Sequence, residues 1–380
     1  MEVLDKLLLL GEESRFDVCD ASCGWPARHS MERVSRYVTR AALPNGSSVM
    51  MLKVLLSNIC QNDCAYCALR AGRDTPRTAF TPEELARCFE QMWRAGMVQG
   101  LFLSSTVGLN PVREMDRLLA TAEIIRRRLE FPGFIHLKIL PGAEPAQVER
   151  AAELADRISI NLEAPSAEHL SLLTSKKRFD EQLLAGLKLA SRLVHSPDPR
   201  RKARSLTTQV IVGAVGETDQ EILQTAWRLY RRLGLARFYY SAFRPIPGTP
   251  LESRPAAPLQ RQNRLYQADF LLRSYGFQLE EILFDAQGNL PAGQDPKQAW
   301  ALAHPQYFPV EVNRASREEL LRVPGIGPRS AARILQARRQ SRLTELSHLR
   351  AMGVNVQRAA PFVLLNGRAP ARQLSLWPEG

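Results

Sequence analysis

The sequence predicts an α/β fold: a parallel sheet of six β/α units, followed by a small all-α domain. Three observations lead to this prediction. Strand-like and helix-like segments alternate over residues 50–278. A Gly- and Pro-rich stretch then interrupts the alternation over residues 279–310. Beyond it, residues 311–368 contain short helical segments around a Pro-Gly-x-Gly turn. Residues 1–49 form an N-terminal extension and residues 369–380 a tail.

The predicted strands are short apolar runs, and a helical pattern follows each of them. The strands are expected at Met51–Ser57, Gly100–Ser104, Phe134–Ile139, Arg157–Asn161, Thr207–Gly213 and Arg237–Ala242. The helices are expected at Thr81–Arg94, Met115–Leu129, Glu144–Leu154, Glu181–Leu193, Asp219–Leu233 and Gln260–Tyr275. The first helix has a clear start, because Thr81-Pro-Glu-Glu84 combines an N-cap, a Pro at N1 and a capping box. Six such units imply right-handed crossovers between parallel strands.

Three cysteines lie in the loop that leaves the first strand. Cys60, Cys64 and Cys67 have the spacing C-x3-C-x2-C. A structural zinc site usually takes four ligands from separated pairs, and no second pair accompanies this loop. A [4Fe–4S] cluster held by three thiolates instead leaves one iron open to a substrate. Three unrelated buried cysteines are the alternative, but the whole chain has only six Cys. We therefore predict an iron–sulfur site here.

Charge and composition indicate the compartment and the kind of partner. The net charge is +12, which favours a polyanionic partner without specifying a fold. From Asn313 to Gly380 there are twelve Arg, no Lys and four acidic residues, a net charge of +8. No apolar run reaches the length of roughly 18 residues that a membrane span needs, so we expect no membrane partner. Because a cluster suits a reducing compartment, we predict a cytoplasmic protein.

A second pair of cysteines, Cys19 and Cys23, lies in the N-terminal extension. These thiols would either ligate a second metal or sense redox state, or they are ordinary loop thiols. The sequence favours the ordinary reading, because no further ligands accompany them.

The C-terminal domain contains a glycine turn between two short helices. A capping box at Ser316-Arg-Glu-Glu319 opens the first helix. The turn that follows, Val323-Pro-Gly325-Ile-Gly327, permits a tight hairpin with exposed amides. This segment resembles the helix-hairpin-helix motif of DNA repair and replication proteins. The resemblance implies that a backbone phosphate is held by the hairpin and the next helix, through Gly325, Gly327, Arg329, Ser330 and Arg333. An ordinary αα-hairpin is the alternative.

A degenerate second turn, Gly353-Val-Asn355, follows this hairpin. Asn can take the place of Gly at a left-handed position. We therefore expect the two hairpins to pair into one compact unit.

The cysteine loop, with Tyr66 before the last Cys, resembles that of the radical S-adenosylmethionine (SAM) superfamily. The resemblance implies a partial (β/α)6 TIM-type barrel, with the chemistry at the C-terminal ends of the strands. It also implies a [4Fe–4S] cluster held by Cys60, Cys64 and Cys67, bound SAM, and a reductant such as flavodoxin or ferredoxin. Reductive cleavage of SAM would give a 5′-deoxyadenosyl radical, which removes a hydrogen atom from a substrate.

The same resemblance extends to residues that would bind SAM. They are Tyr66, Ser104, Ser105, Asn161, Glu163, Gln209 and Gly213. Asn161 and Glu163 would point to one side of the fourth strand, because their spacing is two residues. A polar strand end is the alternative for this pair. The two serines are weaker candidates, because the acid usual in this turn is absent.

Several segments together resemble one group, the DNA modification/repair radical SAM proteins with a helix-hairpin-helix tail. They are Gly100–Ser105, Arg264–Asp269, Asp295–Lys297 and Phe308–Val310, together with the terminal hairpin. This resemblance implies a radical SAM enzyme that acts on DNA in repair or base modification. An RNA-modifying enzyme and a non-enzymatic iron–sulfur scaffold for DNA repair are the alternatives. The target base, the reaction and the oligomeric state are not predicted.

Overall fold

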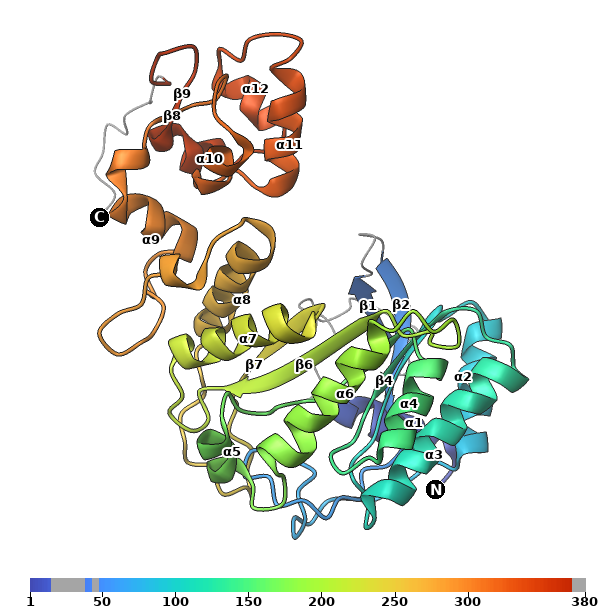
Figure 1. Ribbon diagram of the computed structural model, residues 1–380. Coiled ribbons are helices and arrows are strands. Elements are labelled where there is room, and N and C mark those ends of the chain that lie inside the picture. The colour runs from blue at the N-terminus through green and yellow to red at the C-terminus, as the bar shows by residue number, and fades with distance from the viewer. Residues whose placement is uncertain (15–37, 43–47, 371–380) are drawn as a thin grey trace. The chain divides into compact units, whose positions relative to one another are not determined.

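The computed structural model describes residues 1–14, 38–42 and 48–370, and the chain forms two compact units (Figure 1). The first unit comprises Met1–Glu217 and Arg228–Pro258, and the second comprises Thr218–Trp227 and Leu259–Gly380. Helix α8 (Leu259–Ser274), which the sequence places with the barrel, belongs to the second unit. Within the described ranges, no helix has the length and apolar character required to cross a membrane.

The first unit is built on one seven-stranded sheet with the order β1 to β7. The strands are β1 (Val38–Ala42), β2 (Ser48–Leu55), β3 (Gly100–Ser104), β4 (Phe134–Lys138), β5 (Arg157–Ser159), β6 (Ser205–Val212) and β7 (Arg237–Ala242). Strands β2 to β7 are parallel neighbours. This arrangement confirms the predicted six-unit parallel sheet. Strand β1 is an additional antiparallel neighbour of β2.

The helices of the sheet domain follow the strands, as the alternating pattern predicts. They are α2 (Pro82–Arg94), α3 (Pro111–Glu123), α4 (Pro145–Leu154), α5 (Ala167–Leu173), α6 (Ala185–Val194) and α7 (Asp219–Leu233). Figure 1 shows α2, α3, α4 and α6 along one face of the sheet. The predicted capping box at Thr81 is present. Helix α5 is not anticipated by the sequence.

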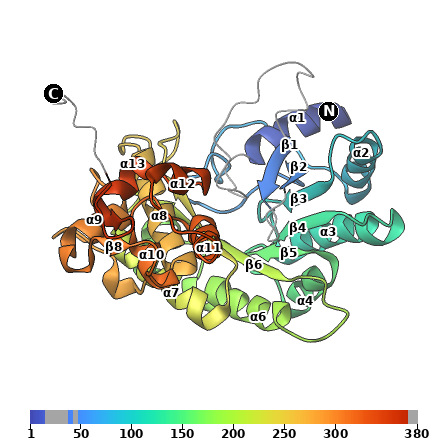
Figure 2. The ribbon, with the colours of Figure 1, turned by 90° about the horizontal axis from the view of Figure 1, so that it is seen from above.

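Two of these helices contain a π-helical turn. Residues Ile124–Arg128 continue α3, and Phe179–Leu184 lead into α6. Helix α1 (Val3–Glu13) packs against β2 (Figure 2).

The core of the first unit lies within and on both sides of the sheet. Every residue of β3 and β6 is buried, which explains why these strands read as continuous runs instead of alternating ones. Because β2 to β7 are parallel, their carboxyl ends meet at one edge of the sheet. The loops that leave this edge carry the polar residues described below.

The second unit is mainly helical. Its helices are α8, α9 (Pro296–Ala303), α10 (Arg317–Arg322), α11 (Pro328–Ala337), α12 (Leu346–Ala351) and α13 (Val356–Ala359). Two short strands, β8 (Val310–Glu311) and β9 (Val363–Leu364), pair in parallel. The Arg322 guanidinium lies 3.7 Å from the ring centroid of Phe277 and 5.0 Å from that of Trp300. The predicted all-α domain is therefore confirmed as a helical region with one small sheet.

Candidate functional site

The cysteine loop leaves the carboxyl end of β2, and a single arginine closes it. The Arg77 guanidinium donates to the carbonyls of Asn58 (2.6 Å) and Leu69 (3.0 Å). It also donates to the carbonyls of Arg70 (2.9 Å) and Arg73 (3.3 Å). These bonds join the two ends of the loop that contains the three thiols. The sequence analysis missed Arg77, because its partners are backbone carbonyls and leave no pattern in the sequence.

Asp63 anchors the middle of the loop to the segment after α5. Its carboxylate accepts from the hydroxyls of Thr174 (2.5 Å) and Ser175 (2.6 Å). Burial opposes ionisation of this carboxyl, but the hydrogen bonds from Ser175 and Thr174 outweigh it and lower the pKa of Asp63 to about 2. The loop is therefore held in place before any ligand binds.

The three predicted ligand thiols lie close together in this loop. Cys64 is buried, while Cys60 and Cys67 are half-buried. Burial raises the pKa of Cys64 and raises that of Cys67 to about 12, and the neighbouring thiols add to both shifts. The N–H of Asn62 donates to Cys60 Sγ (3.4 Å), and that of Leu69 donates to Cys67 Sγ (3.3 Å).

These thiols fit an iron–sulfur cluster better than a single metal ion. Within the described residues, no three His, Cys, Asp or Glu side chains are placed to hold one ion. In a [4Fe–4S] cluster each thiolate binds a different iron atom, so the sulfurs need proximity and not convergence. N–H bonds to the sulfurs are a known means of tuning such clusters. Cys19 and Cys23 lie outside the described residues.

A buried ion pair lies beside the cysteine loop. Glu163 Oε1 is 2.8 Å from Lys177 Nζ, and each side chain is 8% exposed. Tyr66 donates to the same carboxylate. Burial opposes the charge of Glu163, but Lys177 and Lys138 outweigh it and lower its pKa. Burial likewise opposes the charge of Lys177, yet Cys64 and Glu163 hold its pKa above the ordinary value. The pair is thus charged and mutually satisfied.

Asn161 and Glu163 do not lie on a strand, contrary to the prediction that they point to one side of the fourth strand. Strand β5 ends at Ser159, so strand alternation does not govern these residues. Glu163 has a φ of 66°, in the left-handed region. Its backbone instead bridges to Val210 of β6. Glu163 therefore reaches the cysteine loop through a turn, and Asn161 is half-buried near it in the chain.

The other predicted SAM-binding residues lie at or near the carboxyl ends of neighbouring strands. Ser104 is buried at the end of β3. Ser105 donates to Glu114 Oε1 (2.6 Å), a bond within the protein. Gln209 is buried in β6, and its carbonyl accepts from the N–H of Glu163. Gly213 has a φ of 86° and its N–H donates to the Glu217 carboxylate.

A cavity of about 240 Å³ opens beside the loop. Its lining comes from segments that follow β2, β3, β4 and α5, which places it at the carboxyl edge of the sheet. The lining residues are Gln61, Asn62, Val107, Pro111, Pro141, Lys176, Lys177 and Gln182. Lys176 gives this cavity a positive group suited to a carboxylate or phosphate, because the charge of Lys177 is paired with Glu163.

In the second unit, the predicted hairpin joins α10 to α11. The capping box of Ser316 and Glu319 is present. Gly325 has a φ of 84°, and a Cβ there would lie 2.4 Å from the Asn355 carbonyl oxygen. Gly327 caps the N-terminus of α11. The hairpin therefore depends on glycine for its backbone conformation and for a close approach.

The second hairpin packs against the first, as predicted. The Asn355 N–H donates to the Gly325 carbonyl (3.0 Å). The prediction for Asn355 itself is wrong, because its φ is −75° and it is the N-cap of α13. Gly353, with a φ of 81°, occupies the left-handed position instead.

The predicted phosphate-binding side chains fall into two groups. Arg329 and Arg333 are exposed on α11, and the Arg333 guanidinium also donates to the Met352 carbonyl at 3.4 Å. Ser330 is buried, so only its backbone N–H, in the first turn of α11, is suited to a phosphate.

Comparisons with known proteins find similarity in both parts of the chain. Residues 54–228 match the Radical SAM superfamily, and residues 307–356 match the helix-hairpin-helix motif. The threonylcarbamoyladenosine tRNA methylthiotransferase of Thermotoga maritima is 27% identical over 199 residues, 50% of this chain and 43% of that protein. A biotin synthase of Leptospira biflexa is 25% identical over 236 residues, 61% of each chain. The chain thus spans about half the length of these relatives.

A solved structure of methylornithine synthase is similar over 57% of this chain and 60% of that one. The TM-score is 0.47 and the sequence identity is 17%.

Proposed function

We propose that this protein is a radical SAM enzyme that modifies nucleic acid, with DNA as the substrate in repair or base modification, because residues 54–228 match the Radical SAM superfamily and residues 307–356 match the helix-hairpin-helix motif. The observation that carries this proposal is the presence of both parts in one chain. The first supplies a site for radical generation, and the second supplies glycine amides and exposed arginines suited to phosphates. The net charge of +8 over residues 313–380 supports a polyanionic substrate.

The residues of the cysteine loop have distinct tasks in this proposal. Radical SAM proteins use a [4Fe–4S] cluster and SAM, which together supply a carbon-centred radical that removes a hydrogen atom from substrate. Cys60, Cys64 and Cys67 hold the cluster. Arg77 and Asp63 fix the loop, so that the thiols are held near each other before the cluster binds. The cavity that Lys176 and Lys177 line is where we place SAM, because the exposed Lys176 suits its carboxylate, whereas Lys177 is paired with Glu163.

Access to the radical sets a condition on the substrate. A base stacked in a duplex cannot reach a buried site, so the target nucleotide must be flipped out or already unpaired. The hairpin contacts hold the phosphate backbone without reading its sequence. The hairpin contacts themselves therefore make no choice of base.

RNA is the second candidate substrate, and one observation favours it. A relative at 27% identity is named as a tRNA methylthiotransferase. Hairpin contacts to phosphates do not distinguish the two nucleic acids. Competition between DNA and RNA duplexes of the same sequence, at several stated salt concentrations, measures the preference. Tighter binding of RNA at every salt concentration would transfer the proposal to RNA.

The enzyme proposal is tested by anaerobic reconstitution with iron and sulfide. The reduced protein is incubated with SAM, with and without duplex DNA, and 5′-deoxyadenosine is measured. We expect formation of 5′-deoxyadenosine, and an increase when DNA is present. No cleavage of SAM by a protein whose cluster is intact and reduced would refute the proposal.

The scaffold alternative makes a different spectroscopic prediction. A cluster with four protein ligands has no open iron, so SAM would leave its electron paramagnetic resonance spectrum unchanged. With three ligands we expect a clear change.

We place the protein in the cytoplasm, with a flavodoxin or ferredoxin as its reductant. Reduction of the cluster by either protein tests the assignment of the reductant.

A further inference from the structure

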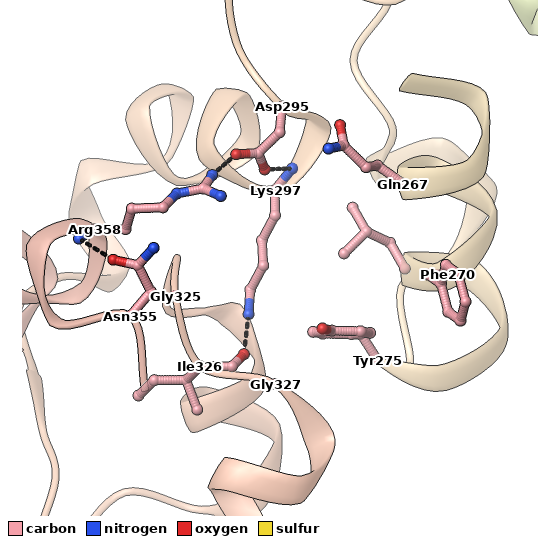
Figure 3. A pocket seen from close by; sticks show the side chains of 11 residues that line it. Gln267, Phe270, Tyr275, Asp295, Lys297, Gly325, Ile326, Gly327, Asn355 and Arg358 are labelled. Carbon is pink, nitrogen blue, oxygen red and sulfur yellow. Dashed lines mark hydrogen bonds and ion pairs between the residues drawn. The ribbon is translucent and has the colours of Figure 1, made fainter. Parts of the chain in front are cut away.

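The second unit contains a cavity of about 350 Å³ beside the first hairpin (Figure 3). Its walls come from α8, the start of α9, the hairpin and the segment that leads into α13. This size is within the range of small-molecule sites, roughly 300–1,000 Å³. The hairpin amides and the exposed arginines of α11 account for phosphate contacts without this cavity. Its polar side chains therefore require a separate explanation.

Lys297 is the buried cation of this cavity. It is 7% exposed. Its Nζ donates to the Ile326 carbonyl (2.5 Å) and lies 4.7 Å from the ring centroid of Tyr275. Within the described part of the chain, this carbonyl is the one hydrogen-bond acceptor found for its three N–H groups. Lys297 is also the only Lys in residues 259–380, which contain fifteen Arg.

The charged groups around Lys297 leave it without an anionic partner. Burial, and then repulsion from Arg322, lower its pKa to about 7. Each nearby carboxylate is already paired: Asp295 with Arg358, and Glu281 with Arg322. Two further groups near this region are Arg264 and the Tyr275 hydroxyl: burial, and then repulsion from Arg264, lower the pKa of Arg358, and burial raises the pKa of Tyr275. An anion that entered the cavity would therefore restore the charge of Lys297.

The opposite wall offers aromatic surface and amide donors. Phe270 is 42% exposed; it projects from α8 together with Gln267, and Tyr275 directly follows the end of that helix (Figure 3). The side-chain oxygen of Gln267, Oε1, accepts from the Arg264 guanidinium (2.9 Å). The side-chain oxygen of Asn355, Oδ1, accepts from the backbone N–H of Arg358 (3.3 Å). Both amide oxygens are thus engaged, so each residue presents its NH₂ group as a donor. Aromatic rings stack on bases, and amide donors suit the acceptors on base edges.

We propose that this cavity binds one nucleotide unit, with its phosphate at Lys297 and its base against Phe270 and Tyr275. The choice of nucleic acid as the source rests on the proposed function, whereas a free nucleotide offers the same chemistry. In a strand, the unit would be an unpaired nucleotide or a strand end, because a stacked base pair does not expose one base to a cavity of this size.

The test is isothermal titration calorimetry on the full chain. The probes are AMP and dAMP, the corresponding nucleosides, a single-stranded DNA hexamer with and without a 5′-phosphate, and a blunt duplex. The variants are Lys297→Met and Phe270→Ala. The matched control is Lys188→Met, which removes an exposed lysine from the first unit.

We expect the nucleotide or the phosphorylated hexamer to bind the wild type and Lys188→Met equally. Lys297→Met should weaken binding by roughly tenfold or more, because it removes a charged partner of the phosphate. Phe270→Ala should weaken binding by roughly fivefold or more through lost stacking. The nucleosides should bind more weakly than the nucleotides.

Proton uptake provides a readout that misfolding would not reproduce. At pH 8 Lys297 is mostly neutral, so phosphate binding should take up a proton, measured as a heat that differs between two buffers of different ionisation enthalpy. Lys297→Arg should retain phosphate binding but lose the proton uptake, because arginine is always charged. A wild type that binds without proton uptake would contradict the assigned role of Lys297.

Comparison of the probes identifies the source of the ligand. Binding of AMP or dAMP alone indicates a free nucleotide, and binding of the phosphorylated hexamer indicates a strand. No Lys297-dependent binding of either would refute the inference. If DNA still stimulates SAM cleavage in that case, the inference fails alone. If binding is present but SAM cleavage is absent, the proposed function fails and the nucleotide site stands.

Discussion

Two lysines whose side chains are almost fully buried, Lys177 in the first unit and Lys297 in the second, have opposite surroundings. Lys177 in the first unit is 2.8 Å from the Glu163 carboxylate, and its pKa is raised despite burial. Lys297 in the second unit contacts a carbonyl and an aromatic ring, and its pKa is lowered to about 7. Both side chains are almost fully buried. Burial of a lysine alone therefore does not indicate an anion-binding site. Lys177 has its counter-ion within the protein, whereas Lys297 lacks one.

The largest effect should come from the thiols next to Lys177. Cys67→Ala removes one of the proposed cluster ligands, so the iron content should fall and SAM cleavage should drop to background. The measurements are iron and sulfide analysis and the 5′-deoxyadenosine assay. Cys88→Ala is the control, because Cys88 is also a buried free thiol but lies on α2. Loss of the cluster in both variants would show a folding defect and not a ligand role.

The same substitution at the two lysines should have opposite effects on stability. Lys177→Met leaves the Glu163 charge buried and unpaired, which should lower the free energy of unfolding by about 3–5 kcal/mol. Lys297→Met removes a buried ammonium that lacks a counter-ion, so stability should be unchanged or higher. Urea denaturation followed by circular dichroism measures both.

A double variant sharpens this comparison. Glu163→Gln combined with Lys177→Met removes both charges and should recover part of the lost stability. Equal destabilisation by the two single lysine variants would contradict the contrast between the sites.

The pH dependence of stability should also separate the lysines. The pKa of Lys297 is about 7 in the folded protein against an ordinary value of 10.5. Between these values the unfolded chain binds one more proton than the folded chain. The free energy of unfolding should therefore rise with pH in this window, by up to about 1.4 kcal/mol per pH unit. Below pH 7 Lys297 is protonated in both states, so it should add no pH dependence there. Denaturation from pH 6 to pH 9.5 tests it, and Lys297→Met should lack this rise.

How far the sequence could predict these sites depends on where their residues lie in the chain. Cys60, Cys64 and Cys67 fall within eight residues, so their spacing alone indicates a shared ligand. The capping boxes at Thr81 and Ser316 are equally local, and both are present. The six parallel strands follow from the alternating pattern.

The features that were missed depend on distant segments or on backbone atoms. The Glu163–Lys177 pair spans the unanticipated helix α5, and the cavity around Lys297 draws on residues from 267 to 358. The turn at Glu163 replaces the expected strand because β5 ends at Ser159. The bonds of Arg77 go to carbonyl groups, which every residue possesses. No spacing in the sequence records any of these contacts.

The smallest predicted effect concerns the exposed face of the hairpin. Arg329→Gln removes one cation that is suited to a phosphate, and this should reduce the slope of log K against log salt concentration by about 0.9. Fluorescence anisotropy with a labelled duplex at several salt concentrations measures the slope. Arg128→Gln, at an exposed position in the first unit, is the control. An unchanged slope for Arg329→Gln would remove this residue from the phosphate contacts.

The central claim is that a radical formed at the cysteine loop removes a hydrogen atom from nucleic acid. The direct measurement is mass spectrometry of the 5′-deoxyadenosine formed from unlabelled SAM in the presence of deuterated DNA or, separately, deuterated RNA. Our account predicts deuterium in the 5′-deoxyadenosine with one of the two substrates, and with DNA in the first instance. Formation of 5′-deoxyadenosine at the same rate with and without nucleic acid, and without deuterium from either substrate, would contradict it.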